Sequence, residues 1–276
     1  MNDDTGPLII AVAPNGAYKS PADHPALPVS AQQIAHTAAA CVNEGASMLH
    51  LHVRDTNGAH SLDADTYRHA IDAVRNALGD RLLIQVTTEA AGKFLAPAQM
   101  ALVRELRPDC VSLAIRELVP DAASESAAAE FFAWVCEAGI IPQFILYSAA
   151  ELRRYQALRE RGVIPVLALP LLFVLGRYSA GQTSDPRGLL PFLDELSHEA
   201  PWMVCAFGTG EHRCAATAAA LGGHVRVGFE NNLALKDGSP AGSNADLVMQ
   251  VRELAAALGR PLADGATART LLRPTA

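Results

Sequence analysis

Residues 82–115 have the sequence LLIQVTTEAAGKFLAPAQMALVRELRPDCVSLAI, in which two short apolar runs flank a longer segment. The runs LLIQVT (82–87) and CVSLAI (110–115) are almost continuously apolar, whereas residues 97–106 repeat apolar side chains with a helical period. Apolar strands joined by a helix are typical of a parallel sheet that is buried on both faces. This stretch therefore predicts a strand, a helix and a second, parallel strand.

The same alternation continues along the chain. We predict strands at 8–13, 48–53, 82–87, 110–115, 141–146, 164–169, 203–208 and 224–229. Helices are expected at 31–45, 64–78, 97–106, 124–138, 149–161, 186–198, 211–221 and 244–258. Without a linker or a shift in composition, this pattern predicts one α/β domain over residues 1–276, a TIM (β/α)8 barrel. A short extra C-terminal helix, Ala263–Leu272, is expected to pack on its outside. The rival fold is a doubly wound open sheet, but no GxGxxG turn follows the first predicted strand.

Composition limits the possible partners and the cellular location. The net charge is −7 and no cluster of Lys and Arg stands out, so we expect no nucleic-acid partner. The five cysteines form no CxxC pair and are interpreted as reduced core residues. No apolar run approaches the roughly 18 residues that span a bilayer, and the N-terminal sequence lacks the features of a signal peptide. We expect a cytoplasmic protein with no membrane partner.

The segment MLHLHVRD (48–55) is the strongest candidate for chemistry. His50 and His52 are two residues apart on a predicted strand, so their side chains point to the same face. In a closed barrel the eighth strand lies two positions from the second, which makes Glu230 the best third ligand. Two histidines and one carboxylate with an open position are typical of a catalytic zinc ion. The alternative is that both histidines are core residues that form hydrogen bonds across strands.

Other polar residues lie where predicted strands end, which is the functional face of a TIM barrel. Arg226 could pair with Glu230 and close the barrel, because the two are four residues apart. Glu89 could be a base, a partner for a cationic group or a solvated loop carboxylate. Glu211 could be an acidic residue that stabilises the first turn of a helix. Arg116 and Glu117 could form a simple surface pair.

With these motifs the chain resembles the β-keto acid cleavage enzymes, the family of the 3-keto-5-aminohexanoate cleavage enzyme. The resemblance rests on NGA (15–17), HPALPVS (24–30), HLHVRD (50–55), QVTT (85–88), FVLGRYSAGQ (173–182) and GGHVRVGFENN (222–232). It implies a zinc-dependent TIM-barrel enzyme that is commonly a homo-oligomer, dimer or tetramer. Such an enzyme converts a β-keto acid and acetyl-CoA into acetoacetate and a new acyl-CoA.

The resemblance also implies roles for particular residues. It makes His50, His52 and Glu230 the ligands of one zinc ion, with Arg226 as a catalytic residue. Thr87 and Ser112 match hydroxyl residues that contact substrate. Zinc would polarise the 3-keto oxygen of the substrate.

Two departures from the family pattern alter these expectations. Asn231 stands where the family has an aspartate as the proposed base, and an amide has no useful basicity. Glu89 is then the favoured base and Glu211 the second candidate. Tyr18 replaces an acidic residue that faces the substrate amine, and Ala114 replaces a polar one, so the substrate pocket is rebuilt.

We expect the remaining substrate contacts to lie on the same face of the barrel. Asn15 and Tyr18 follow the first strand, and Arg116 near the end of the fourth could receive a distal carboxylate. The turn Gly208–Gly210 could bind a CoA phosphate at a helix N-terminus, and residues 176–184 could form a lid or contact the adenine. Two other functions stay open: a zinc hydrolase on a TIM barrel, or a barrel that binds a small acid without catalysis.

Overall fold

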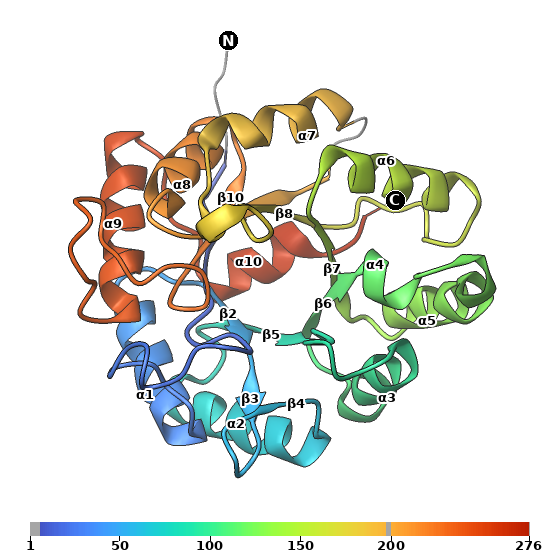
Figure 1. Ribbon diagram of the computed structural model, residues 1–276, viewed down its shortest axis with the longest axis horizontal. Coiled ribbons are helices and arrows are strands. Elements are labelled where there is room, and N and C mark those ends of the chain that lie inside the picture. Colours follow the sequence, from blue (N-terminus) through green and yellow to red (C-terminus); the bar gives the residue numbers. More distant parts are fainter. Residues whose placement is uncertain (1–5, 197–199, 276) are drawn as a thin grey trace.

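Eight parallel strands close into a barrel in the computed structural model, which describes residues 6–196 and 200–275 (Figure 1). They are β1 (Ile10–Val12), β2 (Met48–Leu51), β5 (Leu83–Thr87), β6 (Cys110–Ala114), β7 (Ile141–Leu146), β8 (Leu171–Leu175), β9 (Trp202–Ala206) and β10 (His224–Val227). The order around the barrel is β1-β10-β9-β8-β7-β6-β5-β2, and β1 pairs with both β2 and β10. The predicted TIM barrel is confirmed, and β10 lies two positions from β2.

Helices surround this barrel (Figure 1). They are α1 (Ala31–Asn43), α2 (Ala64–Leu78), α3 (Ala96–Leu106), α4 (Ile115–Leu118), α5 (Glu125–Glu137), α6 (Ala149–Glu160), α7 (Leu190–Glu195), α8 (Glu211–Ala220) and α9 (Asn244–Ala257). Short 3-10 turns cover Ala122–Ser124, Ala180–Gln182 and Pro186–Leu189. The helix boundaries follow local chemistry: at the start of α1 the Ser30 side chain accepts a hydrogen bond from the Gln33 N–H, and the Gln33 side chain accepts one from the Ser30 N–H. None of the described helices is long and apolar enough to cross a membrane.

The sixth predicted strand was wrong. Residues 164–169 form an irregular segment with two tight turns, in which Leu167 N–H donates to Pro165 and Leu169 N–H donates to Leu167. The strand is instead β8, five residues that are all buried. Both runs are apolar, and Pro165 does not explain the difference, because Pro142 occupies the same position of the strand β7. The helix expected at 186–198 is a 3-10 turn followed by the short α7, and residues 197–199 lie outside the described residues.

The last helix, α10 (Gly265–Leu272), does not pack on the outside of the helical ring. Figure 1 shows it behind the strands, across the end of the barrel. Ala268 and Leu272 join an apolar cluster with inward-facing residues of the strands, among them Ile9, Met48 and Leu83. The helix therefore covers the amino-terminal mouth of the barrel and leaves the carboxyl-terminal mouth for a site.

A small hairpin extends the carboxyl end of β2. Strands β3 (Val53–Arg54) and β4 (His60–Ser61) pair antiparallel, and in Figure 1 they lie at the rim of the barrel. Arg54 donates hydrogen bonds from this hairpin to the carbonyls of Gly16 (2.5 Å) and Lys19 (2.8 Å). The hairpin thus holds the loop that follows β1 in place beside the functional face.

Candidate active site

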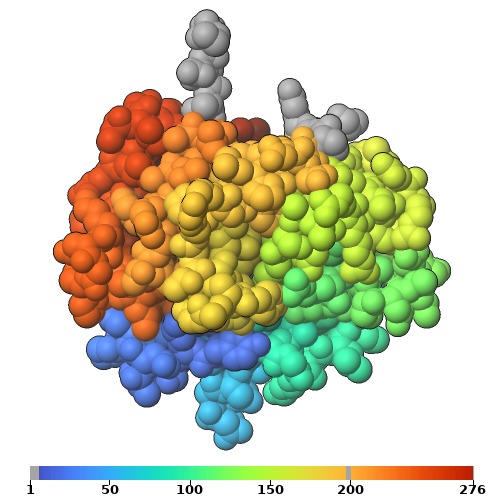
Figure 2. Space-filling view, turned by 45° about the horizontal axis from the view of Figure 1, so that its top comes forward, coloured from blue at the N-terminus to red at the C-terminus, as the bar shows by residue number. Residues whose placement is uncertain are grey.

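A pocket of about 420 Å³ lies at the carboxyl ends of the barrel strands. Side chains from most of the strands, or from the loops that follow them, line it: His50, Thr87, Thr88, Glu89, Ala114, Glu117, Ile145, Tyr147, Val174, Arg177, Phe207, Arg226 and Glu230. A second pocket, of about 820 Å³, shares Glu89, Arg177 and Glu230 with it and continues outward. Figure 2 shows the loop after β8 (yellow) beside the N-terminal segment (blue), and both segments contribute to this outer pocket.

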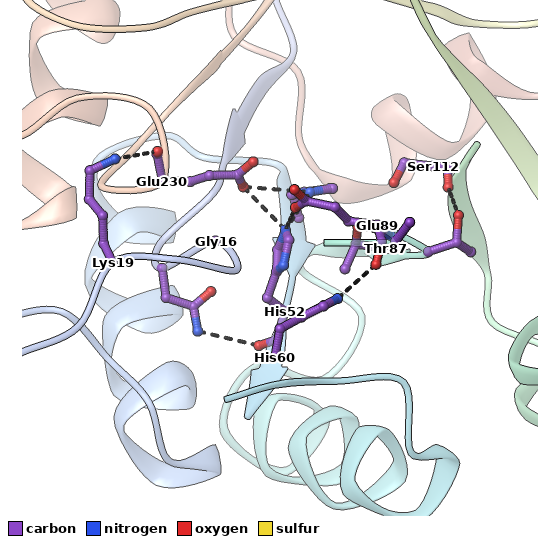
Figure 3. Close-up of polar contacts among 12 residues, drawn as sticks. Gly16, Lys19, His52, His60, Thr87, Glu89, Ser112 and Glu230 are labelled. Carbon is purple, nitrogen blue, oxygen red and sulfur yellow. Dashed lines mark hydrogen bonds and ion pairs between the residues drawn. The ribbon is translucent and has the colours of Figure 1, made fainter. Parts of the chain in front are cut away.

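His50, His52 and Glu230 converge beside the inner pocket, as the sequence predicted. Figure 3 shows the carboxylate of Glu230 directed towards His52. The two Nε2 atoms are 3.1 Å apart, and Oε2 of Glu230 lies 3.4 Å from Nε2 of His52 and 3.6 Å from Nε2 of His50. Ligand atoms at about 2.0–2.1 Å from a tetrahedral zinc ion lie roughly 3.3–3.4 Å from one another. The three side chains therefore fit one face of such a tetrahedron.

The lone pairs that these groups direct into the cluster also fit a cation. Nδ1 of His50 donates to Oε1 of Gln85 at 2.7 Å, which leaves the lone pair of Nε2 directed into the cluster. The orientation of Gln85 is itself fixed, since its amide donates to Gln143 at 2.9 Å. Burial lowers the pKa of His50 well below its ordinary value, so the ring is neutral, the form that binds metals. Oε2 of Glu230 is buried and has no hydrogen-bond partner in the described part of the chain.

Glu230 is held in its charged form. Burial alone would raise its pKa, but Arg226 and the two histidines outweigh burial and hold the pKa well below the ordinary range. Arg226 donates to the other carboxylate oxygen, Oε1, at 3.0 Å. The backbone of Gly16 packs directly against this side chain, because a Cβ added at Gly16 would stand 2.5 Å from Cγ of Glu230. Lys19 donates to the main-chain oxygen of Glu230 at 2.6 Å (Figure 3).

Glu89 reaches the same space from the loop after β5. Its Oε2 lies 3.9 Å from Nε2 of His52, and its Oε1 lies 3.5 Å from Arg177. Burial raises the pKa of this carboxyl. His60 donates to the main-chain oxygen of Glu89 at 2.9 Å, and its ring lies tilted against that of His52, with the ring centroids 5.2 Å apart. Glu89 is therefore a positioned, half-buried carboxylate and not a solvated loop residue.

The predicted substrate contacts fall into two groups, of which the first lies at the pockets. Thr87 lines the inner pocket, and its hydroxyl accepts the N–H of Glu89 at 3.0 Å. Asn15 and Tyr18 line the outer pocket, where Tyr18 is 60% exposed. Asn15 also ties its loop to the barrel, because its amide donates to the carbonyls of Pro28 and His52.

The second group does not line either pocket. Ser112 is buried on β6, and Arg116 is occupied by an ion pair with Glu151 and by the rings of Tyr147 and Tyr178. Arg116 does not pair with Glu117, so the expected surface pair was wrong.

Two further candidates, Glu211 and Asn231, also lie outside the pockets. Both oxygens of Glu211 accept hydrogen bonds, from Gly228 N–H at 3.2 Å and from the Asn232 amide at 3.1 Å. Burial raises its pKa to about 8. The Asn231 amide is buried, and neither of its polar atoms has a hydrogen-bond partner within the described residues. Of the two carboxylates considered as a base, the structure places Glu89 alone at the pocket.

No individual role was predicted for several polar residues that line the pockets, among them Lys19, Tyr147 and Arg177, and Glu117 was interpreted as a surface residue. Arg177 was missed because the sixth strand was misplaced. With β8 at 171–175, Arg177 follows the strand end directly, where functional residues of a barrel gather. Its guanidinium lies 4.9 Å from the ring of Tyr18 and 5.0 Å from that of Phe207.

In the glycine turn before α8, the space beside the glycines is occupied by the protein's own backbone. A Cβ at Gly208 would stand 2.3 Å from the carbonyl oxygen of Gln182, and one at Gly210 would stand 2.3 Å from that of Ser184. These glycines therefore allow the loop after β8 to pack on the turn, which accounts for them without a bound phosphate.

A closed (β/α)8 barrel with two histidines and a glutamate gathered at the carboxyl ends of its strands defines a barrel enzyme with a candidate metal centre. The beta-keto acid cleavage enzyme family matches residues 7–273, and the chain belongs to this family.

Individual relatives agree with this assignment. The 3-keto-5-aminohexanoate cleavage enzyme of Acetoanaerobium sticklandii is 29% identical, over 96% of this chain and 97% of that protein. The 3-oxoadipate:acetyl-CoA acetyltransferase of Cupriavidus necator is 32% identical, over 97% of this chain and 95% of that protein. Among solved structures, apo ObcA matches with a TM-score of 0.71 at 16% identity, over 90% of this chain and 65% of that one, which supports the fold.

Proposed function

We propose that this chain is a zinc-dependent enzyme that converts a β-keto acid and acetyl-CoA into acetoacetate and a new acyl-CoA. The observation that carries the proposal is the convergence of His50, His52 and Glu230 beside a closed-in pocket of a chain that belongs to the β-keto acid cleavage family. The names of the relatives support acetyl-CoA as the co-substrate.

The products define which bonds must change. Acetoacetate requires a bond between C2 of the keto acid and the acetyl carbon, and the new thioester requires a bond between the CoA sulfur and C3. The acetyl–sulfur bond and the C2–C3 bond break in exchange. A proton must therefore leave C2 at the start, and one must return to the acetoacetate at the end.

The chain offers residues for each of these tasks. Zinc held by His50, His52 and Glu230 would supply a Lewis acid for the 3-keto oxygen. Glu89 is suited to take the C2 proton, because it lies in the pocket and burial raises its pKa above the ordinary value. Arg226, which remains cationic, would orient Glu230 and attract the substrate carboxylate. Thr87 would fix the backbone of the Glu89 loop through its hydroxyl.

The outer pocket suits the route of acetyl-CoA. It is larger than the inner pocket, meets it at Glu89, Arg177 and Glu230, and opens between Tyr18 and Tyr178, which are both exposed. We further infer a homo-oligomer in the cytoplasm, which size determination of the purified protein and cell fractionation would check.

A product assay tests the proposal. The zinc-loaded protein is incubated with acetyl-CoA and a panel of β-keto acids, and acetoacetate and new acyl-CoA are measured by mass spectrometry. We expect the wild type to form both products in equal amounts. Glu230→Ala should form neither product, whereas the exposed control Glu253→Gln should form both. Absence of both products with every keto acid, despite bound metal, would refute the proposed reaction and leave a hydrolase or a binding protein.

A further inference from the structure

His52 has no partner for the ring nitrogen that points away from the cluster. Nδ1 of His50 donates to Gln85 at 2.7 Å, whereas Nδ1 of His52 is buried and has no hydrogen-bond partner in the described part of the chain. Nε2 of His52 faces the cluster, 3.4 Å from Oε2 of Glu230, so the proton of a metal-bound ring belongs on Nδ1. A histidine that ligates a metal almost always donates this other N–H to an acceptor. His52 therefore requires an acceptor beside Nδ1.

The ring of His60 offers a complementary atom. It lies against the ring of His52, with the centroids 5.2 Å apart. Its Nε2 donates to the main-chain oxygen of Glu89 at 2.9 Å (Figure 3). Because a carbonyl oxygen can only accept, the proton of His60 sits on Nε2 and Nδ1 keeps a lone pair. Nδ1 of His60 is also buried and without a partner within the described residues. The two adjacent rings thus contain one unpaired donor and one unpaired acceptor.

The hairpin at the end of β2 determines the position of His60. β3 follows His52 directly, and β4 returns antiparallel to it, so that His60 pairs with Arg54. Phe94 packs edge-on against the ring, and only 5% of His60 is exposed. Burial lowers the pKa of His60 to about 3, so the ring is neutral and its lone pair is available. The hairpin therefore returns a neutral acceptor to the segment that carries the metal ligand.

Asn15 is the other candidate acceptor near His52. Its Oδ1 is buried and unpaired among the described residues. Its amide nitrogen, however, is the atom that contacts His52, 3.3 Å from the main-chain oxygen of that residue, and it also donates to Pro28. Asn15 thus contacts the main chain of His52, whereas His60 contacts its ring. His60 is the better-placed acceptor.

We propose that His60 is a positioning residue that serves the metal ligand and the base together. Its Nδ1 accepts the Nδ1–H of His52, directly or across one water molecule, while its Nε2–H holds the main chain of Glu89. The inference rests on the zinc site of the proposed function and deepens it. One ring then orients both a zinc ligand and the carboxylate that takes the substrate proton.

Two substitutions separate the roles of the two ring nitrogens. In His60→Gln the side-chain amide can reach the position of Nε2 and donate to Glu89, but the acceptor beside His52 is lost. In His60→Asn the shorter side chain places its oxygen near the position of Nδ1, and the bond to Glu89 is lost. Competition with a chromophoric chelator should show zinc affinity about 10–100-fold lower in His60→Gln and close to that of the wild type in His60→Asn.

The kinetic effects should show the opposite order. With zinc at saturation, His60→Asn should lower kcat more than His60→Gln and leave KM nearly unchanged, because Glu89 loses the bond that anchors its main chain. The exposed His69 provides the matched control, and His69→Gln should retain the zinc affinity and kcat of the wild type.

NMR spectroscopy tests the pairing in the wild type itself, whether or not a variant folds. Proton–nitrogen correlation spectra of the histidine rings should show His60 protonated on Nε2 and, in the zinc-loaded protein, an Nδ1–H of His52 that is protected from exchange. This protection should disappear in His60→Gln and persist in His60→Asn. A proton on Nδ1 of His60, or equal zinc affinity of His60→Gln and the wild type, overturns the inference. Protection that is lost in Asn15→Ala and not in His60→Gln overturns it too and assigns the acceptor to Asn15.

The zinc and NMR measurements require no turnover, which separates this inference from the proposed reaction. If zinc affinities and ring protonation follow the expectation while no β-keto acid is converted, His60 keeps its positioning role and the proposed reaction fails. If products form while zinc affinity and ring protonation do not depend on His60, the reaction stands and this inference fails. A wild type that binds no zinc overturns both.

Discussion

The guanidinium of Arg226 contacts Oε1 of Glu230 at 3.0 Å and leaves Oε2 facing His50 and His52. One carboxylate thus divides its two oxygens between a permanent cation and two neutral imidazoles. The same contact fixes the rotation of the carboxylate, since Arg226 comes from β10 and is itself buried. The free oxygen of Glu230 is therefore oriented towards the two histidines.

Gly16→Ala should weaken metal binding without touching a ligand. The added Cβ would lie 2.5 Å from Cγ of Glu230, which must then move away from the histidines. Gly16 also has a φ of +64°, where any Cβ is strained. We expect zinc affinity to fall about tenfold or more, as it does when a metal ligand loses the partner that orients it, and competition with a chromophoric chelator measures the change.

Gly58→Ala is the matched control for that variant. Gly58 has a φ of +77°, but a Cβ there has nothing within 4 Å. It should lose a similar amount of stability, about 1 kcal/mol, and keep the zinc affinity of the wild type. Equal zinc affinity in both variants would show that Gly16 does not position Glu230.

Gln85→Leu should lower metal affinity through His50. The substitution removes the acceptor for Nδ1 of His50, so the ring is no longer held with Nε2 facing the cluster. Loss of such a partner typically costs about 10–100-fold in metal affinity. Gln143→Leu is the comparison, because it removes one acceptor of the Gln85 amide in the same barrel interior, while the amide can still donate to Cys110 Sγ and the contact with His50 is preserved. Denaturant unfolding should show a similar loss of stability for both, about 1–3 kcal/mol. A Gln143 variant that loses as much metal affinity would contradict a specific role for Gln85.

Glu89→Gln should slow turnover far more than it weakens substrate binding. The amide keeps the size of the side chain but cannot take a proton, so kcat is expected to fall by about 10²–10⁴. Steady-state kinetics and metal analysis check this, and the zinc content should stay at the level of the wild type. Near-normal kcat would move the search for the base to Glu211, even though both of its oxygens are occupied.

The burial of Glu211 predicts that the free energy of unfolding depends on pH. Burial raises its pKa to about 8 from an ordinary value of 4.5, so between these values the folded state holds a proton that the unfolded state releases. The stability contribution of this group is complete below the lower value and is lost as the pH rises through the upper one. The slope is at most about −1.4 kcal/mol per pH unit.

Glu211→Gln cannot titrate, and its free energy of unfolding should change less between pH 5 and 8 than that of the wild type. Urea unfolding of both proteins in the presence of a chelator measures the difference. Parallel pH profiles would mean that Glu211 is already ionised in the folded protein throughout this range.

The barrel and the ligand cluster could be predicted because their signals are periodic. Alternating apolar runs indicate parallel strands, and the two-residue spacing of His50 and His52 places them on one face. Closure of the barrel then brings Glu230 to them, as the structure shows. That the cluster binds zinc stays a prediction.

The rest of the site depended on features that the sequence does not display. IPVLAL and LLFVL are equally apolar, and Pro165 does not exclude the first, because IPQFIL forms β7 with Pro142 at the same position. Because the strand was predicted at 164–169 and not at 171–175, Arg177 was not recognised as a residue that follows a strand end. Glu117 could not be separated from a surface residue, because its position in the pocket follows from the hydrogen bond that Gln99 donates from α3, a tertiary contact.

The helix across the amino-terminal mouth has a consequence for biosynthesis. Until α10 is in place, Ile9, Met48 and Leu83 at the mouth of the barrel lack their apolar cover. Gly265 must also fit against the backbone of Arg81, where a Cβ would lie 2.5 Å from its carbonyl oxygen. The ribosome synthesises residues 265–272 after all eight strands. The amino-terminal mouth of the nascent barrel therefore stays exposed to water until α10 has been made and has packed against it.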